Sequence, residues 1–368
     1  MGSPGNPARQ TARRTAETLA IAAVGGVALS MAGFPAGLVT GSLLAVAAAA
    51  LLSRPVIVPA PLSRLIMVLV GISLGAAIRP ETLQGLARFP LSVAVLAMST
   101  LGMIAATTLY LRMAHGWDAR SALLGASPGA LAQVMALSAE YRADLPAIAI
   151  VQTVRVVALT VGIPTGLALF GLTAPAGMVP AAAYGADSVP ELAVLVAVSG
   201  ASALAVWRLR LPGGLMFGAM LGSGVLHGTG WVSATLPWWV AALAIIGIGA
   251  LTGSRFANIG PRTLLRFLGA ALGSFAVAAT IASLFVLMLT ALLAIPVADA
   301  VVAFSPGAQD TMMVLALALH LDPVFVGALH LSRFLLVSLL MPLLVHRVRP
   351  SPRTRELPPS AQRPTIED

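Results

Sequence analysis

The sequence Ser127-Pro128-Gly129-Ala130 recurs 178 residues later as Ser305-Pro306-Gly307-Ala308. The same offset pairs Arg155 with Arg333. Similarity within one chain at a fixed offset is the signature of a repeated structural unit. The motif therefore predicts that the chain contains two copies of one domain.

Two further blocks agree at nearly the same offset. Pro35-Ala36-Gly37-Leu38 corresponds to Pro212-Gly213-Gly214-Leu215 at 177 residues, and Gly71-Ile72 corresponds to Gly247-Ile248 at 176. Three blocks in one order indicate a duplication. We expect membrane repeats at 18–170 and 190–346, a linker at 171–189, and disordered polar tails at 1–17 and 347–368.

Composition places both repeats in a lipid bilayer. Hydrophobic residues make up 58% of the chain and charged residues 10%, whereas a soluble domain carries about 25% charged residues. Apolar stretches of about 20 residues, the length of one transmembrane helix, recur along the whole chain. We therefore expect an all-α integral membrane protein and no soluble enzyme.

Charge and residue usage exclude other classes. The net charge of +9 comes from arginines scattered singly between apolar runs, without the basic stripe of a nucleic-acid-binding protein. The absence of Cys excludes disulfides, iron–sulfur clusters and thiol catalysis. Five dispersed His argue against a catalytic metal. We expect no metal, no cofactor and no nucleic-acid partner.

Each repeat contains six apolar segments, and the fifth carries the Ser-Pro-Gly motif in its middle. Ser is favoured at a helix N-cap and Pro at the first helical position. We therefore expect helices to begin near Ser127 and Ser305, with the serines as N-caps, and to run for ~14 residues, or about 20 Å. That length is too short to cross a bilayer, so each fifth segment should be re-entrant or a broken helix.

Arginine placement predicts the topology. If the fifth segments are re-entrant, each repeat has five transmembrane helices and the second repeat is inverted. With a cytoplasmic N-terminus, 18 Arg are then cytoplasmic and two, Arg79 and Arg88, are outside. If the fifth segments cross fully, the split is 12 to eight. The positive-inside rule favours the inverted arrangement, with both termini cytoplasmic and 171–189 periplasmic.

An inverted duplication with helices broken inside the membrane is typical of secondary transporters. The N-terminus of a half-helix carries a partial positive charge and attracts anions. We expect the two breaks and the polar residues near them to form a solute-binding site. Its candidate residues are Ser127, Pro128, Gly129, Gln133, Gln152, Arg155, Ser305, Pro306, Gly307, Gln309, Asp310, His330 and Arg333.

Arg155 and Arg333 each lie near the middle of a sixth segment, where an unpaired charge is costly. Either they bind an anion, or they donate to carbonyl groups of the broken segment and hold it in place; both roles are compatible. Gln152 and His330 lie three residues earlier on the same helical face.

The acidic residues also have alternative roles. Asp310 either binds a coupling proton or cation, or interacts with the helix dipole in the first turn of the half-helix. Asp144 and Asp322 precede helices that begin with a proline nearby, so we expect them to be N-caps rather than ligands.

At these motifs the chain resembles the AbrB-type bacterial membrane proteins, over nearly its whole length outside the tails. The second copy, from Ser305-Pro306-Gly307 to the run Ala328-Leu329-His330-Leu331-Ser332-Arg333, is the closer match. The first copy has Gln152 where the second has His330, so the halves of a shared site would differ chemically. The resemblance implies two copies of one domain and membership of the cation–proton antiporter and anion transporter superfamily. Members also carry the labels regulator of gene expression and ammonia monooxygenase.

We therefore expect a secondary transporter of a small anionic organic solute in the bacterial inner membrane. It would work by alternating access, with proton or cation coupling left open. The expected partners are the lipid bilayer and the solute, and homodimer formation is also left open. The alternative is a membrane protein involved in regulation of gene expression that acts indirectly, because no soluble stretch is long enough for a DNA-binding domain.

Overall fold

The computed structural model describes residues 7–78, 89–128, 131–172, 189–210, 213–257, 259–293 and 295–348, and every regular element in these ranges is a helix. The first half contains α1 (Pro7–Met31), α2 (Gly37–Leu51), α3 (Ala60–Gly75), α5 (Phe89–His115), α6 (Ala119–Ala126), α7 (Leu131–Glu140) and α8 (Leu145–Leu169). The second half contains α9 (Val189–Arg208), α10 (Gly214–Gly228), α11 (Trp238–Gly253), the short 3₁₀-helix η3 (Ser254–Phe256), α12 (Pro261–Leu292), α13 (Val297–Phe304), α14 (Gln309–Ala318) and α15 (Pro323–Arg347).

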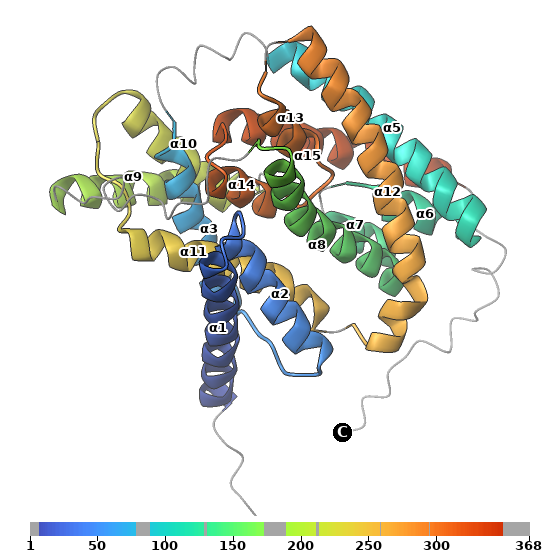
Figure 1. The fold of residues 1–368 in the computed structure, drawn as a ribbon, viewed down its shortest axis with the longest axis horizontal. Coiled ribbons are helices and arrows are strands. Elements are labelled where there is room, and N and C mark those ends of the chain that lie inside the picture. Colours follow the sequence, from blue (N-terminus) through green and yellow to red (C-terminus); the bar gives the residue numbers. More distant parts are fainter. Residues whose placement is uncertain are drawn as a thin grey trace, which may run out of the picture.

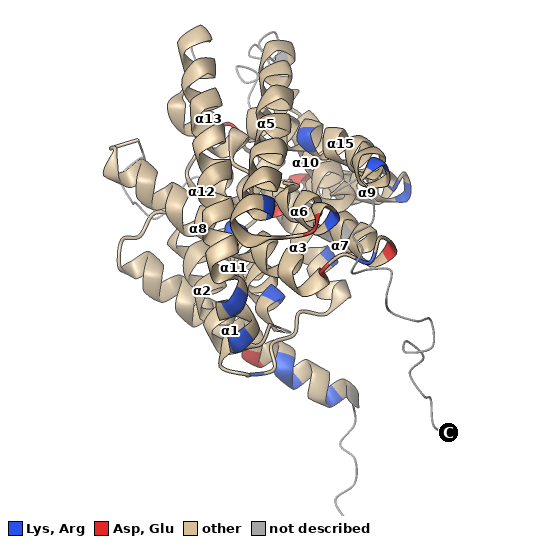
Figure 2. Ribbon diagram, turned by 90° about the vertical axis from the view of Figure 1, so that its right-hand side faces the viewer, with Lys and Arg blue, Asp and Glu red and all other residues tan. Residues whose placement is uncertain are grey.

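The expectation of an all-helical membrane protein is confirmed at this level. Six helical stretches in the described part of the chain are long and apolar enough to cross a membrane: α5, α8, α9, α11 with η3, α12 and α15. The helices α2, α3 and α10 are apolar but only 15 or 16 residues long. Charged residues occupy little of the ribbon (Figure 2). The chain is a multi-pass membrane protein, and the expected total of about ten spans stays a prediction.

The prediction of a disordered N-terminal tail is wrong for residues 7–17, because they form the first turns of α1. Pro7 stands at the helix start, where its missing N–H costs nothing. Arg13 Nε donates to Glu17 Oε1 at 2.8 Å, a pair spaced to lie on one helical face. The polar composition of this stretch therefore belongs to an exposed helix end. The described residues contain nothing of the expected C-terminal tail beyond 348.

Helices from the two halves exchange equivalent contacts. In the centre, α2 packs against α11 and α3 packs against α10, while α1 covers α2 and α9 covers α10. Glycines make the close approach possible. A Cβ at Gly75 of α3 would lie 2.5 Å from Ser223 Cβ of α10. A Cβ at Gly253 of α11 would lie 2.9 Å from Val46 Cβ of α2.

These contacts correct one part of the sequence alignment. Gly75 corresponds to Gly253, an offset of 178, and their contacts Ser223 and Val46 correspond at 177. The same register pairs Gly71 with Gly249 rather than with Gly247, so the expected offset of 176 is wrong. Both helices carry closely spaced glycines, and only their packing against the partner helix distinguishes the registers.

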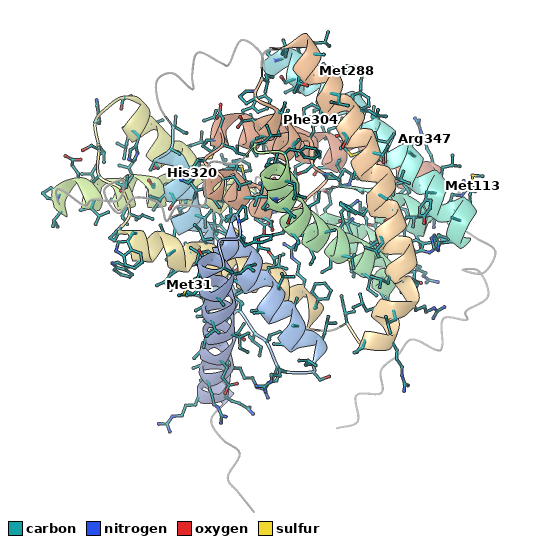
Figure 3. The ribbon with its side chains drawn as sticks, in the orientation of Figure 1. Met31, Met113, Met288, Phe304, His320 and Arg347 are labelled. Carbon is teal, nitrogen blue, oxygen red and sulfur yellow. The ribbon has the colours of Figure 1, made fainter. Side chains whose placement is uncertain are left out.

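Two long helices, α5 and α12, run side by side along one edge of the molecule (Figure 1). α12 also packs on α8, and α5 packs on α15, so each long helix contacts the last helix of the other half. The short helices lie further inside. Phe304, at the end of α13, is fully buried, whereas Met113 at the end of α5 is exposed (Figure 3).

Candidate functional site

Both Ser-Pro-Gly motifs interrupt helices, but the serines end helices instead of beginning them. Ser127 is the C-cap of α6 and Ser305 the C-cap of α13. Both serines have extended backbone, with ψ of 122° and 135°. A residue before proline is driven out of the helical region, because the proline ring clashes with its backbone. The expected role of the serines as N-caps is therefore wrong, although a new helix does begin near each of them.

The second break is described completely. After Ser305, Pro306 and Gly307 lead to Ala308, the N-cap of α14, which has no side-chain capping bond. Ser305 Oγ instead donates back to Val302 O at 2.8 Å. In the first break, Gly129 and Ala130 lie outside the described residues, and α7 begins at Leu131. The half-helices α7 and α14 have ten residues each, fewer than expected.

Arg155, on α8, is tied to the first break. It is 2% exposed. One terminal nitrogen donates to Ser127 O at 2.9 Å and to Gln152 Oε1 at 2.7 Å, and the other contacts Ala126 O at 3.4 Å. Its Nε has no partner. The expected contact with carbonyl groups of the broken segment is therefore present, and one buried donor remains.

Arg333, on α15, repeats this arrangement in the second half. It is 1% exposed. Its two terminal nitrogens donate to Ser305 O and to Ala303 O, the latter at 2.9 Å. Its Nε is again without a partner. The carbonyl groups freed where α13 ends are thus bound by a guanidinium from the next long helix.

Gln152 and His330 differ in what they bind. Gln152 Nε2 donates to Ser127 O at 2.9 Å, while its Oε1 accepts from Arg155. His330 Nε2 lies 3.2 Å from Val302 O, one turn before the break. Gln152 therefore shares a hydrogen-bond network with its arginine, whereas the hydrogen bond of His330 connects it to α13 alone among the described residues.

A small cavity joins the two halves. It is lined by Gln152, Arg155 and Val156 of α8, by Arg255 of η3, and by Pro306, Gly307 and Ala308 of the second break. Its volume of about 10 Å³ is close to the room for one water molecule. Arg155 from the first repeat thus shares a cavity with the broken backbone of the second. The residues Arg333 and His330 do not line it.

Gly307 is closely packed beside this cavity. A Cβ at this position would lie 2.7 Å from Met312 Cγ and 2.8 Å from Met312 Sδ. Met312 is fully buried, and its Sδ also contacts Ser305 Oγ at 3.0 Å. The side chain of Met312 therefore folds back over the break.

Arg255 is a site residue that the sequence analysis missed. Its terminal nitrogen lies 3.3 Å from Asp310 Oδ2, and both side chains are about one-fifth exposed. Asp310 Oδ1 accepts from the backbone N–H of Thr311 at 3.0 Å. Asp310 therefore has a basic partner besides the helix end. The available signal is an arginine directly after an apolar helix, and the inverted topology counts it among the 18 cytoplasmic arginines.

Two of the expected site residues, Gln133 and Gln309, do not line the cavity. Gln133 Nε2 donates to Ser338 O at 3.1 Å, and Ser338 Oγ donates to Gln133 Oε1 at 2.7 Å. Gln133 thus connects α7 to α15. Gln309 lies beside Gly213, the left-handed N-cap of α10 with φ of 61°, where a Cβ would collide with Gln309 Nε2. Of the expected site residues, the cavity brings together Gln152, Arg155, Pro306 and Gly307.

The two aspartates before the last helices are N-caps, as expected. Asp144 Oδ1 accepts from Ala147 N at 3.1 Å. Asp322 Oδ1 accepts from Val324 N at 2.9 Å and from Phe325 N at 3.1 Å. The backbone N–H of each capping aspartate makes an equivalent hydrogen bond in the two halves: Asp144 N donates to Ser121 Oγ at 2.9 Å, and Asp322 N donates to Asp299 Oδ1 at 2.6 Å.

Comparison with known proteins matches one family model over residues 38–349, described as "Transition state regulatory protein AbrB". A Bacillus subtilis (strain 168) protein named "Uncharacterized protein YhjN" is 24% identical over 354 residues, which cover 88% of this chain and 90% of the relative. An Escherichia coli (strain K12) protein named "Putative regulator AbrB" is 28% identical over 257 residues, which cover 69% of this chain and 73% of the relative. The family model spans both breaks, both buried arginines and the cavity between the halves, and the chain belongs to the AbrB family.

Proposed function

We propose that the protein is a secondary transporter of a small anionic organic solute, which binds in the cavity between Arg155 and the second helix break. The observation that carries the proposal is the composition of this cavity. A guanidinium from one repeat and the uncapped start of α14 from the other line the same space. A cation and a helix N-terminus both favour an anion.

The charges support the same reading. In the described part of the chain, ion pairs join Arg13 to Glu17 and Arg255 to Asp310, and neither includes Arg155. Buried charges in proteins are normally paired, since an isolated one is costly. The carbonyl contacts of Arg155 lower that cost but carry no full negative charge. A bound anion would supply the missing counter-charge and accept from the free Nε.

Alternating access fits the duplicated architecture. We propose that the halves are inverted repeats of about five transmembrane helices, that the segments α6–α7 and α13–α14 are re-entrant, and that both termini are cytoplasmic in the inner membrane. The cavity of about 10 Å³ is too small for an organic solute. Solute entry therefore requires a movement of α8 relative to the α13–α14 break.

Flux measurements test this function. Purified protein would be screened for thermal stabilisation by acetate, succinate, citrate, inorganic phosphate and chloride. Uptake of the best ligand into proteoliposomes would then be compared for the wild type, Arg155→Gln and Arg266→Gln. Arg266, which stacks on Phe267 outside the cavity, is the matched control for loss of one arginine charge. Uptake should be lost in Arg155→Gln alone; absence of stabilisation and flux with every anion would refute the proposal.

A second candidate is regulation of gene expression, favoured by the description of the family model and by the name of the Escherichia coli relative. We propose that such a role would be indirect, through the solute that the protein moves. Transcript profiles of a deletion strain carrying the wild type or Arg155→Gln test this. An effect on expression that Arg155→Gln preserves would separate regulation from transport.

A further inference from the structure

Asp310 and the proposed solute have a common partner. Arg255 lines the cavity and at the same time contacts Asp310 Oδ2. No other carboxylate contacts a cavity-lining arginine among the residues that the structure describes. The protein thus places one of its own carboxylates on an arginine of the site, while the space beside that arginine holds no more than about one water molecule.

The contact between these two side chains is weak. A charge-assisted N–H···O bond is commonly about 2.7–2.9 Å, and arginine often binds a carboxylate through two nitrogens. Here a single terminal nitrogen lies 3.3 Å from one oxygen, and both side chains remain partly exposed. The other oxygen of Asp310 accepts from Thr311 N. Arg255 therefore keeps donors that a better-placed carboxylate can use.

Arg155 supplies a second guanidinium to the same cavity. This residue is only 2% exposed, and its Nε has no hydrogen-bond partner. Among the residues that line the cavity, only Val156 has a branched aliphatic side chain. A small carboxylate, with one oxygen for each arginine and little apolar surface, matches this lining.

We propose that the solute is a small carboxylate and that Asp310 is its intramolecular competitor, which occupies Arg255 while the site is empty and is displaced when the solute binds between Arg155 and Arg255. This rests on the proposed function and adds a substrate class and a role for Asp310. The displaced Asp310 keeps its bond to Thr311 N, so α14 does not lose its first-turn contact.

The experiment measures acetate binding to the full-length protein in detergent micelles at fixed pH and ionic strength. Asp310→Asn removes the competing charge with little change of shape, and Asp310→Ser repeats the test with a different side chain. Both should bind acetate about two- to fivefold more tightly than the wild type, the range that loss of a partly exposed ion pair allows. Arg255→Gln should bind at least about tenfold more weakly, and adding Asp310→Asn to it should bring no gain.

Two controls make the outcome specific. Asp299→Asn removes the same charge from α13, away from the cavity lining, and should leave acetate affinity unchanged. Inorganic phosphate and methanesulfonate replace the carboxylate by other anions and should bind more weakly than acetate. Thermal unfolding without ligand verifies that each variant is folded.

Failure of this inference differs from failure of the proposed function. Equal or weaker acetate binding in both Asp310 variants overturns the competition, and phosphate or methanesulfonate binding as tightly as acetate overturns the substrate class. If these results come with anion binding that depends on Arg155, the transporter proposal stands alone. If no anion binds the wild type or any variant, both proposals fall.

Discussion

Arg155→Lys and Arg333→Lys are matched perturbations, because the two arginines occupy corresponding positions but only Arg155 lines the cavity. Lysine keeps the positive charge and loses the planar fork of donors. Each arginine donates to two carbonyl groups at the end of a short helix, α6 for Arg155 and α13 for Arg333. The pair therefore separates support of the helix break, which both residues provide, from anion binding, which we assign to Arg155.

The stability effects follow from the lost hydrogen bonds. A hydrogen bond to a charged group contributes about 1.5–3 kcal/mol, and bonds between membrane helices average about 0.6 kcal/mol. An ammonium can retain one acceptor, so each variant loses one or two bonds, or about 1–3 kcal/mol. Arg155→Lys should be at the upper end, because Gln152 Oε1 accepts from this arginine at 2.7 Å.

Anion binding should separate the two variants. Loss of one charge-assisted bond to the solute weakens binding by about 1.5–3 kcal/mol, roughly ten- to a hundredfold, in Arg155→Lys. Arg333→Lys should stay within about twofold of the wild type, since sites that share no partner couple by a few tenths of a kcal/mol. Acetate titration with thermal unfolding on the same samples measures both quantities. Equal losses of affinity in the two variants would refute the assignment of the site to Arg155.

Three more results are expected. Cys introduced at Ala182, in a chain without native Cys, should react with an impermeant thiol reagent from the periplasm; reaction from the cytoplasm alone would restore the parallel topology. Asp322→Ala should lower unfolding stability by about 0.5–2 kcal/mol and more than Asp144→Ala, since it caps two N–H groups instead of one; equal losses would contradict the cap geometry. Gly75→Ala and Gly253→Ala should each cost about 1–3 kcal/mol through overpacking, whereas Gly162→Ala, with nothing within 4 Å of its Cβ, should be neutral or stabilising. Thermal unfolding in detergent ranks these variants, and a loss at Gly162 equal to that at Gly75 would contradict the packing.

The sequence predicted features that are encoded locally. A buried arginine beside an interrupted helix must find acceptors, and the nearest ones are the carbonyl groups that the interruption releases, so the partners of Arg155 followed from its position. The caps Asp144 and Asp322 likewise depend on a few neighbouring residues. The duplication itself was visible because the motif contains proline and glycine, which tolerate little substitution where the backbone is special.

Other features depend on tertiary structure. Ser305 was expected to begin a helix, because two rules competed and the restriction on a residue before proline outweighed N-cap preference. The residue-by-residue correspondence between α3 and α11 could be set only from the glycines that contact the partner helices α10 and α2. Arg255 follows a helix that ends beside α14, and no local pattern shows that a side chain from η3 reaches Asp310. Its position in the site is a result of packing between halves.

The exchanged packing of α3 on α10 and of α11 on α2 has a consequence for how such a chain can be divided. The glycine-lined face of α3 is covered by α10, and that of α11 by α2, so each face is covered by a helix of the other half. A half produced alone would leave this face exposed. Two separately translated halves should therefore reassemble when co-expressed, and one half should remain unpaired unless a second copy of itself takes the vacant place. The single polypeptide therefore contains two halves that could also be supplied as separate chains, either by two short genes or by one gene whose product pairs with itself.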